Sequence, residues 1–179
     1  TNNLNANSCG ILLNSSNNNT VTYNDANDND FGILLNSSVG NALSYNQMYE
    51  NSYNFGADGI NRIDISNRVD GKSVLYLVKN ESEIINSSSD AGTVYCIDCM
   101  NITVENLTLT NNVNAIYFRN TTNSIVSNNS LNGNLYGINV IYSSKNTLEY
   151  NSVYENRYDG IALRSSNNNT IKDNRVAHN

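Results

Sequence analysis

The chain has 179 residues, about a fifth of them asparagine, with neither proline nor tryptophan and a formal net charge of −6. This length is typical of one domain with a real core. The negative charge leaves no basic stripe that could neutralise phosphates, so we expect no nucleic-acid partner. The longest apolar run, residues 74–78, is too short to span a bilayer, so we expect no membrane insertion.

A repeat of about 22 residues organises most of the chain. Each unit starts with Gly or Ala and an alternating apolar segment, followed in fixed order by apolar and Asn positions. The starts are Gly10, Gly32, Ala115, Gly137 and Gly160. Period-two alternation is typical of β-strands, and a unit of this length holds about three short strands. We therefore predict an all-β fold, a right-handed, single-stranded parallel β-helix that forms one domain over residues 1–179.

One Asn position recurs in five units, as Asn24, Asn46, Asn129, Asn151 and Asn174. Stacked coils place equivalent residues above one another, so each amide can donate to the next across the strand spacing. We predict that these residues form a structural Asn ladder. Because Asn and Gly both tolerate left-handed backbone, we also expect them and the glycines at the unit starts to serve sharp bends.

An acidic segment follows the second apolar stretch. Asp25, Asp28 and Asp30 gather oxygen ligands that suit Ca²⁺, but Asp30 stands where an EF-hand loop requires Gly. A solvated turn is the interpretation that we prefer. Calcium at these three residues is the weaker alternative, and we expect no other cofactor.

Residues 61–91 interrupt the repeat, since the Gly and Asn markers are missing over much of this segment. We predict an irregular coil or outward excursion there, with a turn at Asp70-Gly71-Lys72. The rest of the segment is either a β-hairpin or a widened coil.

The run Cys96-Ile97-Asp98-Cys99, followed by Met100, contains residue types that bind soft metals. A second pair is missing, and positions i and i+3 of an extended strand point to opposite faces. We therefore expect neither a metal centre nor a disulfide. His178 is the only histidine, which argues against His-dependent catalysis, and we predict no catalytic residues.

Charged residues recur on the predicted outer surface. Glu105 and Glu149 occupy equivalent positions two coils apart, as do Arg119 and Arg164. Such residues would suit a carbohydrate-binding or carbohydrate-cleaving face, and solvated surface charge is the alternative. Aromatic platforms for sugars could come from outward tyrosines, namely Tyr45, Tyr49, Tyr117, Tyr142, Tyr150 and Tyr154.

Acceptor sequons for N-glycosylation are frequent, as expected by chance in a chain rich in Asn and Ser. Asn14, Asn36 and Asn120 begin sequons near outward bends, where a glycan would fit. If the chain is secreted, we expect some of these sites to be occupied.

The pattern G-I-x-L…S-x-x-N-T-I-x-x-N-x-x-x-x-N resembles the parallel β-helix repeats of the NosD-like family, also described as carbohydrate-binding and sugar-hydrolase repeats. Residues 160–174 are a full instance. Residues 69–78 resemble a V-D-G-K-P-V-Y-Y-L-V stretch in β-helical surface proteins of methanogenic archaea, with Ser73 in place of Pro. The resemblance implies the fold, whereas its members include a periplasmic copper-related maturation protein, polysaccharide-active enzymes and surface proteins.

The preferred interpretation is a non-catalytic, extracellular or cell-surface structural module. Open coils at both ends would allow self-association head to tail into a homopolymer filament. A carbohydrate-binding or polysaccharide-cleaving module, with glycans as partners, is the first alternative. A NosD-like periplasmic copper-handling protein that uses Cys96, Cys99 and Met100 is the second.

Overall fold

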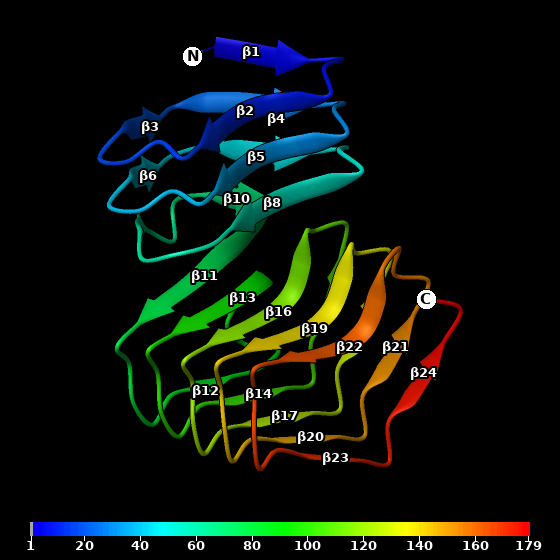
Figure 1. Cartoon of the computed structure of the whole chain (residues 1–179). Coiled ribbons are helices and arrows are strands. Elements are labelled where there is room, and N and C mark those ends of the chain that lie inside the picture. Colours follow the sequence, from blue (N-terminus) through cyan, green and yellow to red (C-terminus); the bar gives the residue numbers. More distant parts are fainter. Residues whose placement is uncertain (1) are drawn as a thin grey trace.

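The structure is a computed structural model that describes residues 2–179, and it contains 24 β-strands and no helix among them. The strands form two stacks of coils, the N-terminal stack (residues 2–69) and the C-terminal stack (residues 72–179) (Figure 1). A complete coil has one longer strand followed by two short ones. The predicted all-β solenoid with Asn ladders is confirmed.

The N-terminal stack has three parallel faces. Its long strands are β2 (Cys9–Asn14), β5 (Phe31–Asn36) and β8 (Tyr53–Ala57). One short face holds β3 (Thr20–Thr22), β6 (Ala42–Ser44) and β9 (Arg62–Ile63). The other holds β1 (Asn2–Asn5), β4 (Asn24–Asn27), β7 (Gln47–Tyr49) and β10 (Arg68–Val69).

The C-terminal stack repeats this plan. Its long strands are β11 (Lys72–Val78), β13 (Ala91–Ile97), β16 (Asn114–Arg119), β19 (Tyr136–Ile141) and β22 (Asp159–Arg164). One short face holds β12 (Ile84–Ile85), β14 (Thr103–Glu105), β17 (Ile125–Ser127), β20 (Thr147–Glu149) and β23 (Thr170–Lys172). The other holds β15 (Thr108–Thr110), β18 (Ser130–Asn132), β21 (Ser152–Tyr154) and β24 (Arg175–Ala177).

Register follows the repeat, because each coil places like residues over like residues. Ile116 pairs with Ile138, which pairs with Ile161, and Leu109 pairs with Leu131. The inward members of these columns are almost completely buried, apart from those of the last coil. Stacking therefore removes from water an apolar edge that a single coil would expose.

The predicted Asn ladder forms in both stacks. Asn24 donates from Nδ2 to Oδ1 of Asn46 at 3.0 Å. In the C-terminal stack, Asn129 donates to Asn151 at 3.0 Å, and Asn151 donates to Asn174 at 2.9 Å. Each ladder amide therefore satisfies polar groups that would otherwise be buried without a partner.

The expected cause of the bends is wrong in two respects. The left-handed residue is the one before each ladder Asn, for example Asn128 and Tyr150, both with φ of 56°. The glycines at the unit starts do not have positive φ either. A Cβ on Gly137 would lie 2.5 Å from the carbonyl oxygen of Gly160. Glycine is thus required there because neighbouring backbones approach closely, and not because the chain bends.

Residues 61–91 contain the connection between the stacks. β10 and β11 pair antiparallel, with Val69 opposite Lys72, and are the one antiparallel pair in residues 2–179. Asp70 (φ 47°) and Gly71 (φ 80°) form the two-residue turn, and positive φ at both positions is the type I′ hairpin geometry. The turn lies where it was predicted, and the hairpin forms around it. The rest of the segment contributes strands to the two stacks, β9 to the first and β11 and β12 to the second.

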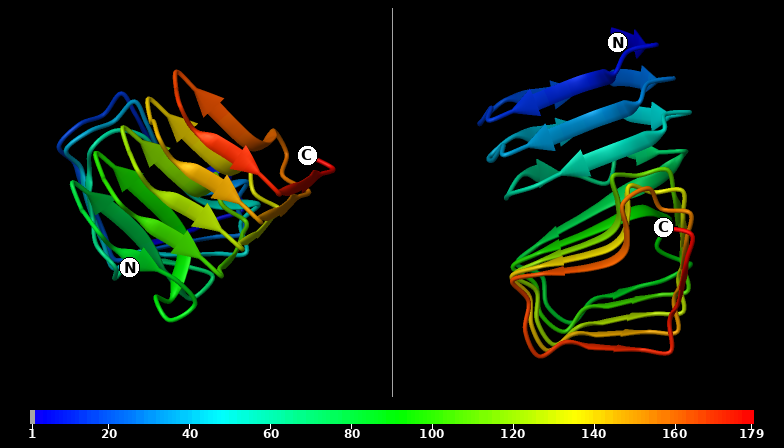
Figure 2. Two further views of the ribbon diagram at one scale, coloured as in Figure 1. Left: turned by 90° about the horizontal axis from the view of Figure 1, so that it is seen from below. Right: turned by 45° about the vertical axis from the view of Figure 1, so that its right-hand side comes forward.

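This hairpin joins the short face β1-β4-β7-β10 to the long strands of the C-terminal stack in one nine-stranded sheet. The two stacks are not coaxial: the right-hand view of Figure 2 looks along the C-terminal stack, while the N-terminal coils appear edge-on. The end of the N-terminal core next to β8 is covered by the outer face of the sheet that the long strands of the C-terminal stack form. Tyr95, Ile97 and Tyr117 of that face pack in the same buried cluster as Phe55.

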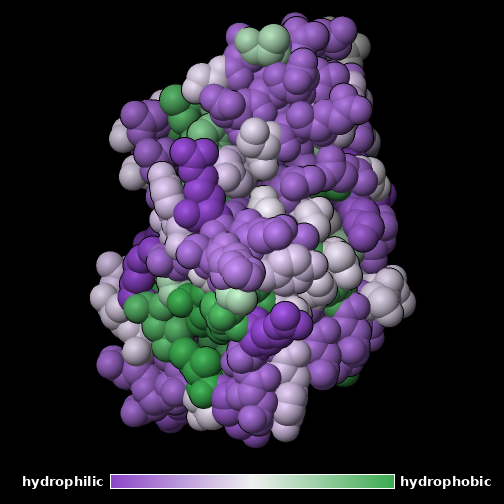
Figure 3. Space-filling view, turned by 90° about the vertical axis from the view of Figure 1, so that its right-hand side faces the viewer, coloured by the Kyte–Doolittle hydropathy of each residue, from purple (hydrophilic) through white to green (hydrophobic). Residues whose placement is uncertain are grey.

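The last coil of the C-terminal stack presents apolar side chains. Figure 3 views the molecule from the side on which this coil lies, and hydrophobic surface is gathered in the lower half of the picture. In β23 and β24, Ile171 is 50% exposed and Val176 is 48% exposed.

Candidate functional site

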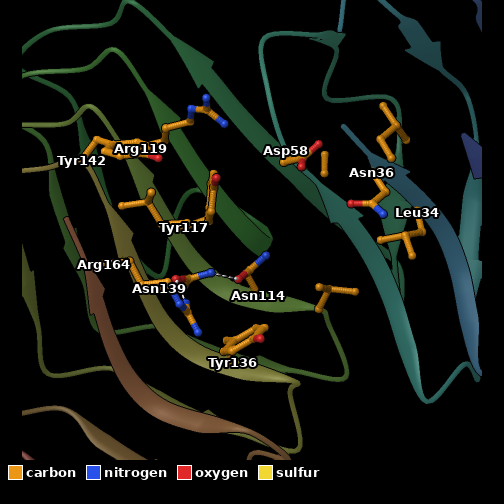
Figure 4. Close-up of a pocket in the computed structure, with 14 residues that line it drawn as sticks. Leu34, Asn36, Asp58, Asn114, Tyr117, Arg119, Tyr136, Asn139, Tyr142 and Arg164 are labelled. Carbon is orange, nitrogen blue, oxygen red and sulfur yellow. Dashed lines mark hydrogen bonds between the residues drawn. The ribbon is translucent and has the colours of Figure 1, made fainter. Parts of the chain in front are cut away.

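A groove of about 430 Å³ lies in the angle between the two stacks. Leu34 and Asn36 of β5 and Asp58, just after β8, line it from the N-terminal stack. The outer face of β16, β19 and β22 forms the opposite side (Figure 4). The groove exists because the N-terminal stack covers the outer face of β11, β13 and part of β16 and leaves most of the outer face of β19 and β22 uncovered.

Three tyrosines line the groove, and two of them expose aromatic surface to it. Tyr136 is half-buried and Tyr142 is 60% exposed, whereas Tyr117 is buried. Burial raises the pKa of the Tyr117 phenol, with the positive charge of Arg119 acting in the opposite direction. This phenol therefore stays neutral and keeps its O–H at physiological pH.

Arg164 is held in place by three partners. Its guanidinium donates to Asn139 Oδ1 at 2.6 Å and to Asp159 Oδ2 at 3.0 Å, and its Cζ lies 4.9 Å from the centre of the Tyr136 ring. Asn139 in turn donates to Asn114 Oδ1 at 2.9 Å. The floor of the groove is thus a fixed polar network next to an aromatic ring.

Arg119 differs from Arg164 because it forms no ion pair within residues 2–179. Its Cζ lies 6.0 Å from the centre of the Tyr142 ring, a cation–π distance. The guanidinium carries five N–H donors that a ligand in the groove can use.

Asp58 faces Arg119 and the tyrosines from the other stack (Figure 4). Its Oδ1 atom is buried and has no hydrogen-bond partner within residues 2–179. Because solvent does not reach this atom, a ligand in the groove would contact Asp58 through the rest of its carboxylate.

The four residues expected on one carbohydrate face lie on two different faces. Arg119 and Arg164 lie on the long-strand sheet and line the groove. Glu105 and Glu149 lie in β14 and β20, on a short face, and Glu149 pairs with Lys172 at 2.9 Å. The ladder order Glu105, Ser127, Glu149, Lys172 follows the expected spacing, but the structure does not bring the acids to the arginines.

Of the six tyrosines suggested as platforms, Tyr117 and Tyr142 line the groove. Tyr45 stacks on Tyr23 in the N-terminal stack, with ring centres 4.6 Å apart. The remaining platform candidates, Tyr49, Tyr150 and Tyr154, are not among the residues that line the groove.

The sequon residues Asn14, Asn36 and Asn120 are all exposed. Asn14 and Asn36 are neighbours in register, and Asn36 also lines the groove. Asn120 donates to Asp98 Oδ1 at 2.8 Å. Their glycosylation stays a prediction.

The acidic segment does not form a compact ligand set. Asp25 is a half-buried residue of β4, whereas Asp28 and Asp30 are exposed residues after that strand. Within residues 2–179, no three His, Cys, Asp or Glu side chains gather in a group that could hold a metal ion. The same residues contain no helix that is long and apolar enough to cross a membrane.

The expectation that Cys96 and Cys99 point to opposite faces is wrong. Both thiols lie in the core of the C-terminal stack, because Asp98 between them is left-handed, with φ of 55°. A hydrogen bond with Cys96 lowers the pKa of Cys99 to about 7, and burial raises the pKa of Cys96. Met100 is 38% exposed, so the three sulfur ligands of the copper alternative do not converge.

Sequence reasoning missed Asp58 and Tyr136. Asp58 lies just before the irregular segment and has no equivalent acid in neighbouring coils. Tyr136 directly precedes Gly137, and Tyr158 lies two residues before Gly160. A tyrosine near the start of successive units is the signal that could have identified an aromatic column.

A comparison with protein families identifies the class. The family model described as "Right handed beta helix region" matches residues 68–179, more than half of the chain, and the chain belongs to this family. The match begins at β10 and spans the whole C-terminal stack. No curated protein and no solved structure matches the chain.

Proposed function

We propose that this protein is a non-catalytic β-helical module that binds carbohydrate in the groove between its two stacks. The observation that carries this proposal is Arg119, which forms no ion pair within residues 2–179 and lies over the exposed ring of Tyr142 in a groove that Asp58 also lines. A sugar offers hydroxyl donors for the carboxylate, hydroxyl acceptors for Arg119 and an apolar ring face for tyrosine. An extracellular or cell-surface location belongs to this proposal.

Binding is proposed in place of cleavage because of the carboxylates. Glycoside hydrolysis generally uses a pair of carboxyl groups on either side of the bond. Asp58 is the one carboxylate among the residues that line the groove within residues 2–179, and Glu105 and Glu149 lie on another face.

The test is a glycan array probed with the labelled chain, followed by calorimetry with a retained glycan. Tyr142→Ala is expected to weaken binding about two- to tenfold, the energy of one aromatic contact. Asp58→Asn replaces one carboxylate oxygen with an amide that cannot accept, and it should weaken binding as well.

Tyr150→Ala is the matched control. Tyr150 and Tyr142 are both left-handed corner residues, with φ of 56° and 50°, and are 54% and 60% exposed. Only Tyr142 lines the groove. Equal weakening by both variants, or retention of no neutral or acidic glycan on the array, would overturn the proposal.

A further inference from the structure

A second cavity of about 260 Å³ lies between the stacks, beside the groove. Phe31 and Tyr53 line it from the start of β5 and β8, and Arg157 and Tyr158 line it from the segment before β22. The rings of Phe31 and Tyr53 lie 5.5 Å apart. The composition therefore resembles that of the groove: aromatic rings with an arginine.

The two cavities meet at a pair of aromatic rings. Tyr136 lines the groove and Tyr158 lines the second cavity, and their ring centres lie 5.6 Å apart in an edge-on arrangement. Leu135, the residue before Tyr136, also lines the second cavity. Val113, which lines the groove, packs against Gly56 of β8, where an added Cβ would lie 2.7 Å from its Cγ2.

β19 sets the length of the surface that the groove and the second cavity form together. From Tyr142 to Tyr136 the chain covers six residues of extended strand, about 20 Å at the usual rise. Tyr158 and the second cavity lie beyond Tyr136. A single sugar is too short to contact both Tyr142 and Tyr158, whereas a chain of sugars that lies along the angle between the stacks contacts both.

Side-chain exposure is consistent with a ligand at the far end. Tyr158 is 57% exposed, and Arg157 is exposed and forms no ion pair within residues 2–179. This arginine supplies donors at the second cavity as Arg119 does in the groove. An arginine without an ion pair therefore lies at each end of the path, Arg119 beside Tyr142 and Arg157 beside Tyr158.

We infer that the ligand is an extended oligosaccharide or polysaccharide chain, which runs from Tyr142 past Tyr136 to Tyr158 and the second cavity. This inference rests on the proposed function and narrows it to a class of ligand. Arg157 and Tyr158 form the distal subsite.

The experiment is calorimetry with two probe series, neutral β-1,4-linked glucose oligomers and acidic α-1,4-linked galacturonate oligomers, each of one, three and six units. Affinity should rise with length in at least one series. Tyr158→Ala should weaken binding of the six-unit oligomer about fivefold, the size of one aromatic contact, and leave the shortest binder unchanged. Tyr150→Ala is again the control.

The outcomes separate the two proposals. Binding that does not depend on length, or equal effects of Tyr158→Ala on short and long oligomers, would overturn the extended-chain inference while leaving carbohydrate binding intact. If the array retains a glycan but no oligomer of either series binds, the extended-chain inference fails and carbohydrate binding stands. If the array retains no glycan either, the proposed function fails and the inference fails with it.

Discussion

Replacing Asn129 with alanine tests how much one ladder amide contributes to stability. The side chain is 1% exposed and makes three hydrogen bonds of 3.0 Å. Its Oδ1 accepts from the backbone N–H of Leu107, and its Nδ2 donates to Val104 O and Asn151 Oδ1. Asn129→Ala therefore leaves the Leu107 N–H buried without an acceptor. Asn151 Oδ1 still accepts from the backbone N–H of residue 129.

The expected loss follows from these contacts. An orphaned buried donor costs about 1–3 kcal/mol and each further lost hydrogen bond about 1 kcal/mol, so the free energy of unfolding should fall by about 3 kcal/mol. This is a large part of the roughly 5–15 kcal/mol that stabilises a typical domain. Urea unfolding followed by circular dichroism measures the change.

Asn132→Ala, three residues further along the same coil, is the matched control. Asn132 lies half-buried in β18, and its side chain makes no hydrogen bond within residues 2–179. Its substitution should change stability by less than about 0.5 kcal/mol. If Asn129→Ala costs less than about 1 kcal/mol and equals this control, the ladder hydrogen bonds do not stabilise the fold.

Two core substitutions, cysteine labelling and electron microscopy test other features of the molecule. Tyr95→Ala removes a fully buried ring from the contact between the stacks and should cost about 3–5 kcal/mol in urea unfolding, against about 1 kcal/mol for Tyr95→Phe. Gly137→Ala places a Cβ 2.5 Å from Gly160 O and should lower stability by about 1–3 kcal/mol, seen as a lower melting temperature. Cys96 and Cys99 are buried in the core whereas Cys9 is half-buried, so iodoacetamide should label Cys9 first in the folded protein and the other two only in urea, which peptide mass spectrometry can follow. Head-to-tail self-association predicts unbranched fibres in electron microscopy across a concentration series, and short rods that never extend would contradict it.

Much of the fold could be predicted because the repeat is visible in the sequence as a regular spacing of apolar residues and Asn. Residues 22 positions apart occupy the same place in successive coils, so the pairing of Asn129 with Asn151, or of Leu109 with Leu131, follows once stacking is assumed. The turn at Asp70-Gly71 was also predictable, because Asp and Gly adopt positive φ at low cost.

The side on which a residue points was less predictable near the ends of strands. Alternation assigns Cys96 and Cys99 to opposite faces, but one left-handed residue, Asp98, turns both into the core. Glycines at the unit starts could be found in the sequence, whereas the reason for them, the close approach of neighbouring backbones, is a property of the stacked coils. Between Cys96 and Cys99, the left-handed conformation of a single residue therefore outweighs the period-two pattern of a strand.

The sequence by itself determined the coil, its register and the Asn ladders, because these depend on contacts that every unit repeats with its neighbours. Only the tertiary structure decided where the two stacks meet. The hairpin at β10–β11 reverses the strand direction, and the outer face of the long-strand sheet then covers the open N-terminal core. Asp58 and Arg119 come to face each other across the groove through this single packing event. That contact occurs once in the molecule, so no repeated pattern in the sequence encodes it.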